Sequence, residues 1–446
     1  MSDARFSYSQ DDFQRIARFV LDHAKTNGAS AADTEVSEGF GQTVTVRKNE
    51  IETVEYNKDK GVGVTVYMGH RKGHASTSDL SDAALKATVE KAATIARHTA
   101  EDEAAGLPDR DWLATDRPEL DLFHPWDIDV EQAAELAKAC EAAAFRVDRR
   151  IENSEGASVS TQASHFIYAN SLGFMGGYAG SRHGISAAVI AAEKGAMQRD
   201  YWYSSARDAT DLESAEKIGR MAGERTVRRL NGRKLDTRTC PVVFEAPVAI
   251  SLLNSFVGAV SGGSLYRKSS FLLDSLGQTI FSSIVNLRED PFMKKGLGSC
   301  PFDNEGVKVS ARDVVKDGVV QGYFLSTYSA RKLGMASTGN AGGSHNLSLQ
   351  PGELDLPELL KKMGTGLLVT EMLGQGANMV TGDYSRGAAG FWVDNGEIQY
   401  PVEEITIAGN LKDMYKGILA IGKDVDRRGS KQTGSILVDQ MTVAGN

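Results

Sequence analysis

The feature that most constrains the fold is an order of elements that occurs twice in the first half of the chain. Residues 10–26 place apolar side chains at helical spacing, which predicts an amphipathic helix with one buried face. Residues 81–100 begin with a serine cap and again keep apolar residues on one side. Between these helices, β-branched residues alternate with polar ones and Gly, Asn and Asp supply turns, which predicts short strands at 34–36, 42–46, 51–56 and 61–67.

The same order returns after an irregular bridge at about residues 102–129. Residues 130–147 predict a helix, residues 151–203 predict strands, and residues 212–230 predict a further helix. This recurrence suggests a structural duplication, which rests on the order of elements rather than on residue identity. Each predicted unit is a helix, an antiparallel sheet and a helix, and the two units span residues 1–100 and 130–235.

A polar, charged segment at residues 228–241 separates this region from one of different amino-acid composition. Beyond it the chain is rich in glycine, and we expect few helices, with two at about 248–260 and 356–363. Short strands are expected at segments such as 322–327, 390–393 and 404–407. We therefore predict an α+β protein with an N-terminal α/β domain (residues 1–235) and a mostly antiparallel β domain with few helices (residues 236–446).

Composition limits the classes of partner. The net charge of -9 and a pI near 5.5 argue against nucleic acid, because nucleic-acid binders usually carry a basic patch. Residues 1–13 show no secretory signal, and no apolar run reaches the roughly 20 residues that a bilayer requires. Cys140, Cys240 and Cys300 are widely spaced and are expected to be free thiols. We expect a cytoplasmic protein with no membrane span.

Histidine is distributed unfavourably for a zinc site in the second domain. A hydrolytic zinc ion normally needs three protein ligands and an open position for water. Seven of the eight histidines precede residue 184, His345 is the only later one, and no His-Glu-x-x-His occurs. His70 and His74 are close in sequence, but on the predicted strand they would lie about 13 Å apart. We predict no metal site in this chain.

Other catalytic patterns are incomplete. Residues 417–424 resemble a P-loop, but Asp424 stands where a magnesium-binding Ser or Thr should be. Ser385 lacks an obvious histidine and acid partner. Cys300 and His345 form the only Cys/His combination in the second domain, and a cysteine nucleophile stays open because sequence does not show whether they meet.

Three clusters of glycine with polar residues stand out in the second domain. Glycine allows another backbone to approach closely, and neighbouring Arg, Tyr and Asn side chains can pair with peptide amides. Such clusters are typical of a surface that grips an extended peptide or a partner, although tight β-turns with solvated tips give the same pattern. The candidate binding residues are Tyr266, Arg267, Lys268, Asn340, His345, Asn346, Asp383, Tyr384, Ser385 and Arg386.

Several long segments resemble one family of proteins. They are YNKDKGVGVTVY, LDLFHPWDID, GGSLYRKSSFLLDSLG, STYSARKLGMASTGNAGG and a run from MGTGLLVTEMLGQGANMVTGDYSRGAAGF to NLKDM. Together they resemble the TldD/PmbA family (peptidase U62 type), closest to its PmbA (TldE) members. The resemblance covers nearly the whole chain.

The resemblance implies a cytoplasmic bacterial protein that pairs with a TldD-type subunit in a heterodimeric metallopeptidase. Such assemblies cleave unfolded or flexible peptides, including peptide-antibiotic precursors and antitoxins. In TldD members a helical His-Glu-x-x-x-His and a late Cys hold the zinc. This chain has no His at the matching residues 244–252 and no thiol at 431–434. We therefore expect no catalytic residue and no cofactor on this chain, and zinc on the TldD-type partner.

Two further hypotheses belong to different classes. The chain could be a self-sufficient homo-oligomeric hydrolase that uses an unrecognised site such as Cys300 with His345. It could instead be a non-enzymatic protein-binding modulator, since family members have been described as modulators of DNA gyrase. A homodimer in isolation is consistent with each hypothesis, because a surface made for a related subunit can pair with itself.

Overall fold

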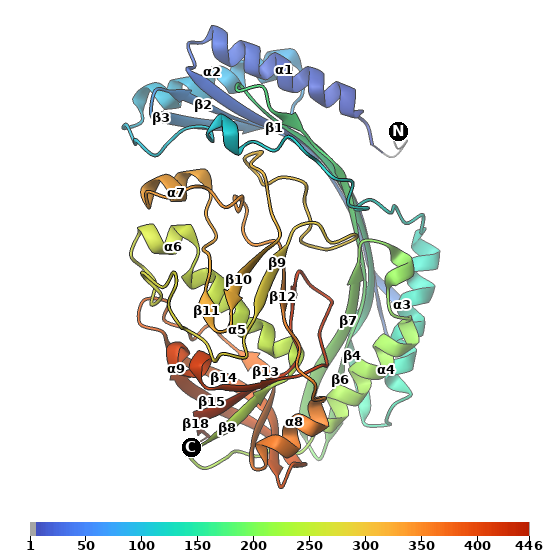
Figure 1. The fold of residues 1–446 in the computed structure, drawn as a ribbon. Coiled ribbons are helices and arrows are strands. Elements are labelled where there is room, and N and C mark those ends of the chain that lie inside the picture. Colours follow the sequence, from blue (N-terminus) through green and yellow to red (C-terminus); the bar gives the residue numbers. More distant parts are fainter. Residues whose placement is uncertain (1–5, 446) are drawn as a thin grey trace.

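A long, curved sheet of seven strands runs through the first half of the chain (Figure 1). The structure is a computed structural model that describes residues 6–445. Residues 1–5, which belong to the segment in which we expect no secretory signal, lie outside the described part. The strand order is β3-β2-β1-β4-β6-β7, and β5 pairs with β4. The elements are α1 (Gln10–Thr26), β1 (Ala31–Arg47), β2 (Glu50–Met68), β3 (Arg71–Thr77), α2 (Asp82–His98), α3 (Val130–Phe145), β4 (Ile151–Asn170), β5 (Met175–Gly176), β6 (Ala179–Glu193), β7 (Ala196–Ala206) and α4 (Ala215–Arg228).

The two predicted units share one sheet. β1 pairs with β4 in antiparallel register from Asp33 opposite Asn170 to Val46 opposite Ala157. Each half of the sheet carries a helix before and a helix after its strands, as the sequence pattern predicts. The α+β class is therefore confirmed, while the two predicted sheets form one continuous sheet.

Two of the turns predicted within the first unit, at residues 37–41 and 57–60, are wrong, because these residues lie within β1 and β2. Gly39 and Gly41 lie in the middle of β1, where they pair with Asp59 and Asn57 of β2. The turn predicted between residues 46 and 51 is confirmed at Lys48–Asn49, where both residues have positive φ. A Cβ on Gly41 would meet the Gln162 side chain at 3.0 Å, so this glycine serves the close approach of neighbouring strands rather than a turn.

Helices cover only the convex face of the sheet, as Figure 1 shows. Alternate residues of β1, including Val36, Val44 and Val46, point to that face and are buried under the helices. One core lies under α1 and α2, and a second lies under α3 and α4. The concave face is left open toward the second half of the chain.

The second half contains two smaller sheets, ordered β15-β14-β13-β8-β18-β16 and β11-β10-β9-β12-β17. Most pairings are antiparallel, as expected, while β8 with β13 and β12 with β17 are parallel. The elements are β8 (Arg238–Phe244), α5 (Ala246–Ala259), α6 (Gly262–Tyr266), β9 (Leu287–Asp290), β10 (Arg312–Lys316), β11 (Val319–Val320), α7 (Thr327–Lys332), β12 (Asn346–Leu349), α8 (Leu356–Met363), β13 (Gly366–Leu373), β14 (Asp383–Asp394), β15 (Glu397–Asn410), α9 (Leu411–Lys416), β16 (Ile418–Ile421), β17 (Lys431–Gln432) and β18 (Ile436–Ala444).

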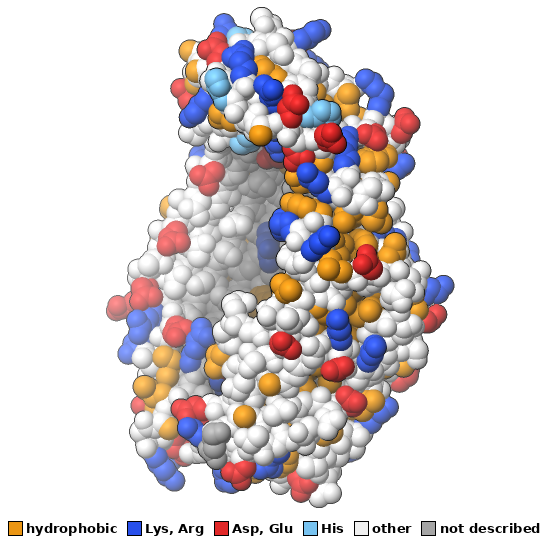
Figure 2. Space-filling view, turned by 90° about the vertical axis from the view of Figure 1, so that its left-hand side faces the viewer, with side chains coloured by type: hydrophobic (Ala, Val, Ile, Leu, Met, Phe, Trp, Pro, Cys, Tyr) orange, Lys and Arg blue, Asp and Glu red, His pale blue; other side chains and the backbone are white. Residues whose placement is uncertain are grey.

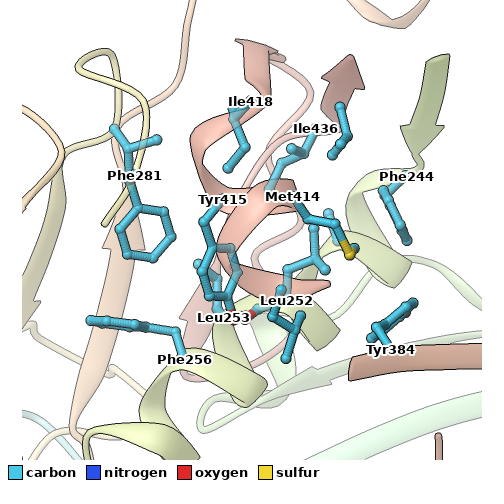
Figure 3. Packing of buried hydrophobic residues seen from close by; sticks show 14 of the residues in the cluster. Phe244, Leu252, Leu253, Phe256, Phe281, Tyr384, Met414, Tyr415, Ile418 and Ile436 are labelled. Atoms are coloured by element: carbon cyan, nitrogen blue, oxygen red, sulfur yellow. Dashed lines mark hydrogen bonds between the residues drawn. The ribbon is translucent and has the colours of Figure 1, made fainter. Parts of the chain in front are cut away.

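The core of this half is packed around α5, and Figure 3 shows Tyr415 of α9 among its apolar side chains. The Tyr415 ring lies 4.5 Å from the Phe281 ring, centroid to centroid, and its hydroxyl donates to the Leu252 carbonyl at 3.0 Å. The buried phenol is therefore satisfied, as a buried polar group must be. This packing fixes the position of α5.

The helices predicted at 248–260 and 356–363 are confirmed as α5 and α8. The strand predicted at 322–327 is wrong. Phe324 makes only an isolated bridge to Ser261, and Ser326 forms a capping box that starts α7 at Thr327. Among the described residues, none of the helices combines the length and apolar character that crossing a membrane requires.

Candidate functional site

A cavity of about 300 Å³ lies where the long sheet meets the start of α5. Figure 1 shows α5 running from the sheet toward α6, so its first turn faces β7. Pro247, Val248 and Ser251 contribute one wall from α5, and Thr370 and Met372 contribute another from β13. The remaining lining residues are Asp200, Tyr201, Trp202, Tyr203, Arg225, Ile250, Asn254, Glu371, Arg386, Asp426 and Arg428.

Arginine side chains hold the carboxylates on one side of this cavity. Glu245, the residue before α5, accepts from Arg225 Nη1 at 2.9 Å and from Arg228 Nη2 at 3.2 Å. Arg225 Nε also lies 3.4 Å from Asp200 Oδ2. Burial opposes the charge of Arg225, but Glu245 and Asp200 together keep its pKa above the ordinary value. These groups form an ion-pair network between α4 and α5.

The other carboxylates of the cavity are paired in the same way. Arg428 donates to Asp426 at 2.7 Å, and its guanidinium lies 3.7 Å from the centre of the Trp202 ring. Glu371 accepts from Arg229. The acidic residues in the wall are therefore engaged by guanidinium groups of this chain.

The side chains at the start of α5 do not fit a hydrolytic zinc ion. Such an ion takes His, Cys or carboxylate ligands in a tetrahedral arrangement, and residues 244–252 contain neither His nor Cys. Glu245, the carboxylate at this position, is already shared by two arginines. Within residues 6–445 there is no group of three or more His, Cys, Asp or Glu side chains that could hold a metal ion.

The histidine pair singled out by sequence does not converge. His74 lies on β3 with its Nδ1 3.3 Å from Thr65 Oγ1. His70 lies in the turn before β3, with its Nδ1 3.2 Å from the Ala105 carbonyl. Each ring thus meets a different protein group.

A serine and an aspartate anchor the start of α5. The Ala246 amide donates to Ser435 Oγ at 3.0 Å, and that hydroxyl donates to Asp424 Oδ2 at 2.6 Å. Asp424 is the residue that interrupts the P-loop pattern, and the segment containing it leads from β16 toward β17 without a helix. Its role is to order this end of the cavity rather than to bind nucleotide.

Two hydroxyl groups in the cavity make no well-formed hydrogen bond to the described residues, although the Ser251 hydroxyl interacts with the Tyr384 phenol. They are Ser251 Oγ on α5 and Thr370 Oγ1 on β13, and both atoms are buried. Nearly all buried polar groups in native proteins are hydrogen-bonded, so unpaired ones often mark a site for water or ligand. The side-chain Nε atoms of Arg225 and Arg386, which also line the cavity, lack a well-formed hydrogen bond too.

The sequence-predicted residues at the start of β14 are partly brought to this cavity. Arg386 lines it and donates to the Gly374 carbonyl at 2.6 Å. Tyr384 is buried beside it, and burial raises the pKa of its phenol to about 12. Asp383 accepts from Thr381 in a turn, while the side chain of Ser385 is exposed.

A second predicted group lies at the far end of α5. Tyr266 packs edge to face on Tyr328, with ring centres 5.6 Å apart, and the Arg267 guanidinium lies over the Tyr266 ring. Lys268 follows in the left-handed backbone conformation and is exposed. The cavity lining reaches along α5 only as far as Asn254, so this aromatic patch is not part of it.

The third predicted group is internal to the fold. Asn340, His345 and Asn346 are all buried. Glu289 accepts from the Asn340 side chain at 2.8 Å and from the His345 amide at 2.9 Å. The side chain of Asn346 donates to the Asp290 carbonyl. These three side chains cross-link loops inside the domain and are not part of the surface that we assign to binding.

Cys300 and His345 do come together. Cys300 Sγ lies 3.3 Å from His345 Nδ1, and the opposite ring nitrogen lies 2.9 Å from the Gly339 carbonyl. Burial, with the nearby carboxylates of Asp303 and Glu289, raises the pKa of the thiol to about 12. The cysteine is therefore protonated at neutral pH, which opposes a nucleophilic role.

Sequence reasoning missed the arginine network and Thr370. The available signal was the dense basic run at 225–229, with Arg225 and Arg228 three residues apart on one face of a helix. A helix pattern cannot reveal that this face meets Glu245.

A larger hollow lies along the concave face of the long sheet, and Figure 2 shows it opening to one side. Glycine and small polar residues of β1 and β4, such as Gly39, Gly41, Gln162 and Ser164, line a space of about 500 Å³ there. A further space of about 790 Å³ lies beside Asp33 and Glu35. The walls of these two spaces combine uncharged polar groups with the charged side chains of residues such as Glu35, Asp59 and Arg182, and both kinds of group can pair with a peptide backbone.

Comparisons with known proteins agree with these features. Sequence profiles of the PmbA/TldA metallopeptidase family match three segments: domain 1 at residues 32–96, the central domain at 123–230 and the C-terminal domain at 237–445. Metalloprotease PmbA of Escherichia coli O157:H7 is 49% identical over 95% of this chain and 94% of its own length. A PmbA homologue of Haemophilus influenzae is 47% identical over 100% of this chain and 99% of its own length.

Solved structures share the fold. A proposed modulator of DNA gyrase from Bacteroides thetaiotaomicron superposes with a TM-score of 0.93 at 28% identity, over 98% of this chain and all of that one. TldE from Thermococcus kodakarensis superposes with a TM-score of 0.83 at 20% identity, over 96% of this chain.

Proposed function

This chain belongs to the PmbA/TldD family of metallopeptidases, and from that premise we propose that it is the peptide-binding, non-catalytic subunit of a two-subunit peptidase. In this proposal a TldD-type partner supplies the zinc ion, and the substrates are unfolded or flexible peptides such as peptide-antibiotic precursors and antitoxins. Family membership itself supports peptide-bond hydrolysis as the general activity of the assembly.

The observation that carries the proposal is the arginine network at the start of α5. A zinc peptidase needs an available carboxylate and open ligands near the metal. Here Glu245 is bound by Arg225 and Arg228, and the remaining carboxylates of the cavity have arginine partners of their own. The acidic side chains that a catalytic metal site would require are therefore already paired with guanidinium groups.

Peptide binding is supported by the hydroxyls of Ser251 and Thr370, which make no well-formed hydrogen bond to the described residues, and by the hollow along the concave face. An extended peptide exposes its backbone amides and carbonyls, whereas a folded substrate has already paired them. The polar and charged groups of this wall can pair with such amides and carbonyls. This accounts for a preference for unfolded substrates.

Cytoplasmic location is part of the proposal. Its structural support is that Cys140, Cys240 and Cys300 are free thiols. Proteins of oxidising compartments more often pair their cysteines in disulfides.

The test measures bound zinc and cleavage of an unfolded peptide, for this chain alone and mixed with a TldD-type partner. We expect zinc and activity only in the mixture, with zinc remaining on the partner after separation. One equivalent of zinc and full activity in this chain alone would overturn the proposal. The chain alone should still bind the peptide, which fluorescence anisotropy would detect.

A second candidate function rests on the 3.3 Å contact between Cys300 and His345. It makes this chain a self-sufficient cysteine hydrolase, with the thiol activated by the imidazole. The raised thiol pKa argues against it. Cys300→Ser should leave activity of the mixture unchanged under our leading proposal, and loss of activity in that variant would favour the cysteine enzyme.

A further inference from the structure

The cavity at the start of α5 holds one arginine that no carboxylate of the described residues neutralises. Each carboxylate in its wall, and each one joined to the wall through an arginine, has a guanidinium partner. The pairs are Asp200 with Arg225 and Arg229, Glu245 with Arg225 and Arg228, Glu371 with Arg229, and Asp426 with Arg428. In this network the arginines and the carboxylates balance one another. Arg386 also lines the cavity, and within residues 6–445 it forms no ion pair, so its positive charge is left for a ligand.

A loop between β13 and β14 holds Arg386 in place. Its Nη2 donates to the Gly374 carbonyl at 2.6 Å, and the Ser385 amide donates to the Gly376 carbonyl at 2.7 Å. A Cβ on Gly376 would lie 2.8 Å from Arg386 Cγ, so glycine allows the loop to lie against the arginine side chain. Arg386 Nε is buried and makes no well-formed hydrogen bond to the described residues. The guanidinium is therefore fixed at one end while an N–H at the other lacks an acceptor.

Three hydroxyl groups beside this guanidinium also lack a strong acceptor. Thr370 is 4% exposed, and its hydroxyl has no hydrogen-bond partner among the described residues. The Ser251 hydroxyl makes no well-formed hydrogen bond and interacts with the Tyr384 phenol, which also interacts with Arg386. The Tyr384 hydroxyl donates to Met372 Sδ at 4.0 Å, and a thioether is a weak acceptor. The cavity thus offers several donors to whatever enters it.

A carboxylate matches this set of groups. An ionised carboxylate has two oxygens that only accept hydrogen bonds, and its charge makes bonds from arginine short and strong. A carboxylate that is taken out of water needs an opposite charge beside it, which Arg386 supplies. The volume of about 300 Å³ is at the lower end of the range for small-molecule sites, so it suits one side chain or one chain end.

We propose that this cavity binds a carboxylate group of the peptide substrate, with Arg386 as its pairing cation and the hydroxyls of Thr370, Ser251 and Tyr384 as hydrogen-bond donors. The carboxylate belongs either to the C-terminus of the peptide or to an Asp or Glu side chain. The inference rests on the proposed function and adds a substrate feature to it. At the position where catalytic relatives are expected to hold zinc, this chain anchors the peptide by its negative charge.

A set of matched peptides tests the inference on the unaltered protein. The set has one unstructured sequence with an N-terminal fluorophore, with either Glu or Gln at one internal position and with either a free or an amidated C-terminus. Fluorescence anisotropy measures the affinity of the full chain, alone and mixed with a TldD-type partner. We expect a peptide that carries the recognised carboxylate to bind about tenfold more tightly than the peptide that carries none.

The same set distinguishes the two sources of the carboxylate. A preference that is lost on amidation assigns the site to the peptide C-terminus. A preference that is lost when glutamine replaces glutamate assigns it to an acidic side chain. Either result supports the inference, because both ligands present the same chemical group to Arg386.

Arg386→Gln tests which residue recognises the charge. This variant should bind the carboxylate-bearing peptide about tenfold more weakly and the uncharged peptide as the unaltered chain does. A variant with a purely structural defect would instead weaken all peptides equally. The control is Arg288→Gln, which removes an arginine that pairs with Asp313 and is 56% exposed, and which should keep the preference. Unchanged circular dichroism would show that both variants remain folded.

The outcomes separate this inference from the proposed function. Equal affinity for all peptides of the set would overturn the carboxylate site and leave peptide binding intact. A preference that persists in Arg386→Gln, or an equal weakening of all peptides by that variant, would also overturn the site. No binding of any peptide, by the chain or by the mixture, would overturn both the site and the proposed function.

Discussion

Arg225 Nη1 donates to Glu245 Oε2 at 2.9 Å, which joins the last turn of α4 to the residue that precedes α5. Both side chains are buried. This contact bridges the long sheet and the second half of the chain at the position where catalytic relatives are expected to hold zinc. The contact therefore bears both on the stability of the fold and on whether this chain can hold a metal ion.

Arg225→Met should destabilise the protein by about 3 kcal/mol, because it leaves the buried Glu245 with one arginine instead of two. Chemical denaturation with circular dichroism would measure the change. The control Arg220→Met breaks an exposed pair with Glu224 and should cost less than about 0.5 kcal/mol. Arg225→Met/Glu245→Met should recover much of the loss, because no uncompensated carboxylate remains. Equal costs for the two single arginine variants would contradict the buried network.

Thr370→Val should separate stability from binding. The buried Thr370 hydroxyl has no partner, so its removal should leave the free energy of unfolding unchanged or slightly higher. Loss of one hydrogen bond to a bound peptide should weaken peptide affinity roughly fivefold. Fluorescence anisotropy with an unfolded peptide would measure this. Ser255→Ala, whose hydroxyl donates within α5 to the Ser251 carbonyl, is the control and should bind normally. Unchanged affinity in Thr370→Val would exclude this hydroxyl from the site.

Asp303 should make stability depend on pH. Burial, with the neighbouring Glu305 charge, raises its pKa from 3.8 to about 7, although three backbone amides donate to it. Because the folded protein binds this proton more tightly, the contribution is complete below the unfolded pKa and is lost as pH rises through the folded value. The loss should reach about 1.4 kcal/mol per pH unit between roughly pH 4 and 7.

Asp303→Asn removes this titration. The variant should be less stable overall, since its amide faces the Ala341 N–H, but its disadvantage should shrink as pH rises from about 5 to 7. Denaturation of both proteins across that range gives the slope. A constant difference in the free energy of unfolding would show that Asp303 does not titrate there.

Gly219→Ala tests close packing of α3 and α4. Alanine favours a helix by about 1 kcal/mol over glycine. However, its Cβ would lie 1.9 Å from the Cys140 carbonyl oxygen, so the helices must separate. We expect a net loss of about 2 kcal/mol. At Gly258 of α5 the nearest atom to a new Cβ is the flexible Met379 side-chain end at 3.5 Å, so Gly258→Ala should be neutral or stabilising. Thermal unfolding would compare the two.

The helices were predictable because each carries its signal locally. Apolar spacing and a capping serine or aspartate mark α1, α2 and α8, and the structure places them within one or two residues of the predicted ranges. Strand ends were less predictable. Gly39 and Gly41 have the composition of turn residues, yet they lie within β1 because neighbouring strands on both sides pair with them.

The candidate site shows the same division. Arg386 was singled out from its glycine-rich segment and does line the cavity. Arg225 and Glu245 were not linked, because they lie 20 positions apart in the sequence and the segment between them contains only local patterns. Asn340 and His345 looked like surface residues, but the carboxylate of Glu289, about fifty positions away in sequence, holds them inside the domain.

By itself, the sequence determined the α+β class, the helices, the family and the absence of histidine from the start of α5. Those properties depend on residue type and on the spacing of residues that are close together in the sequence. Only the tertiary structure decided that two predicted sheets are one, that Cys300 meets His345, and that Arg225 binds Glu245. These are long-range contacts, and their partners are selected by the packing of whole helices and strands.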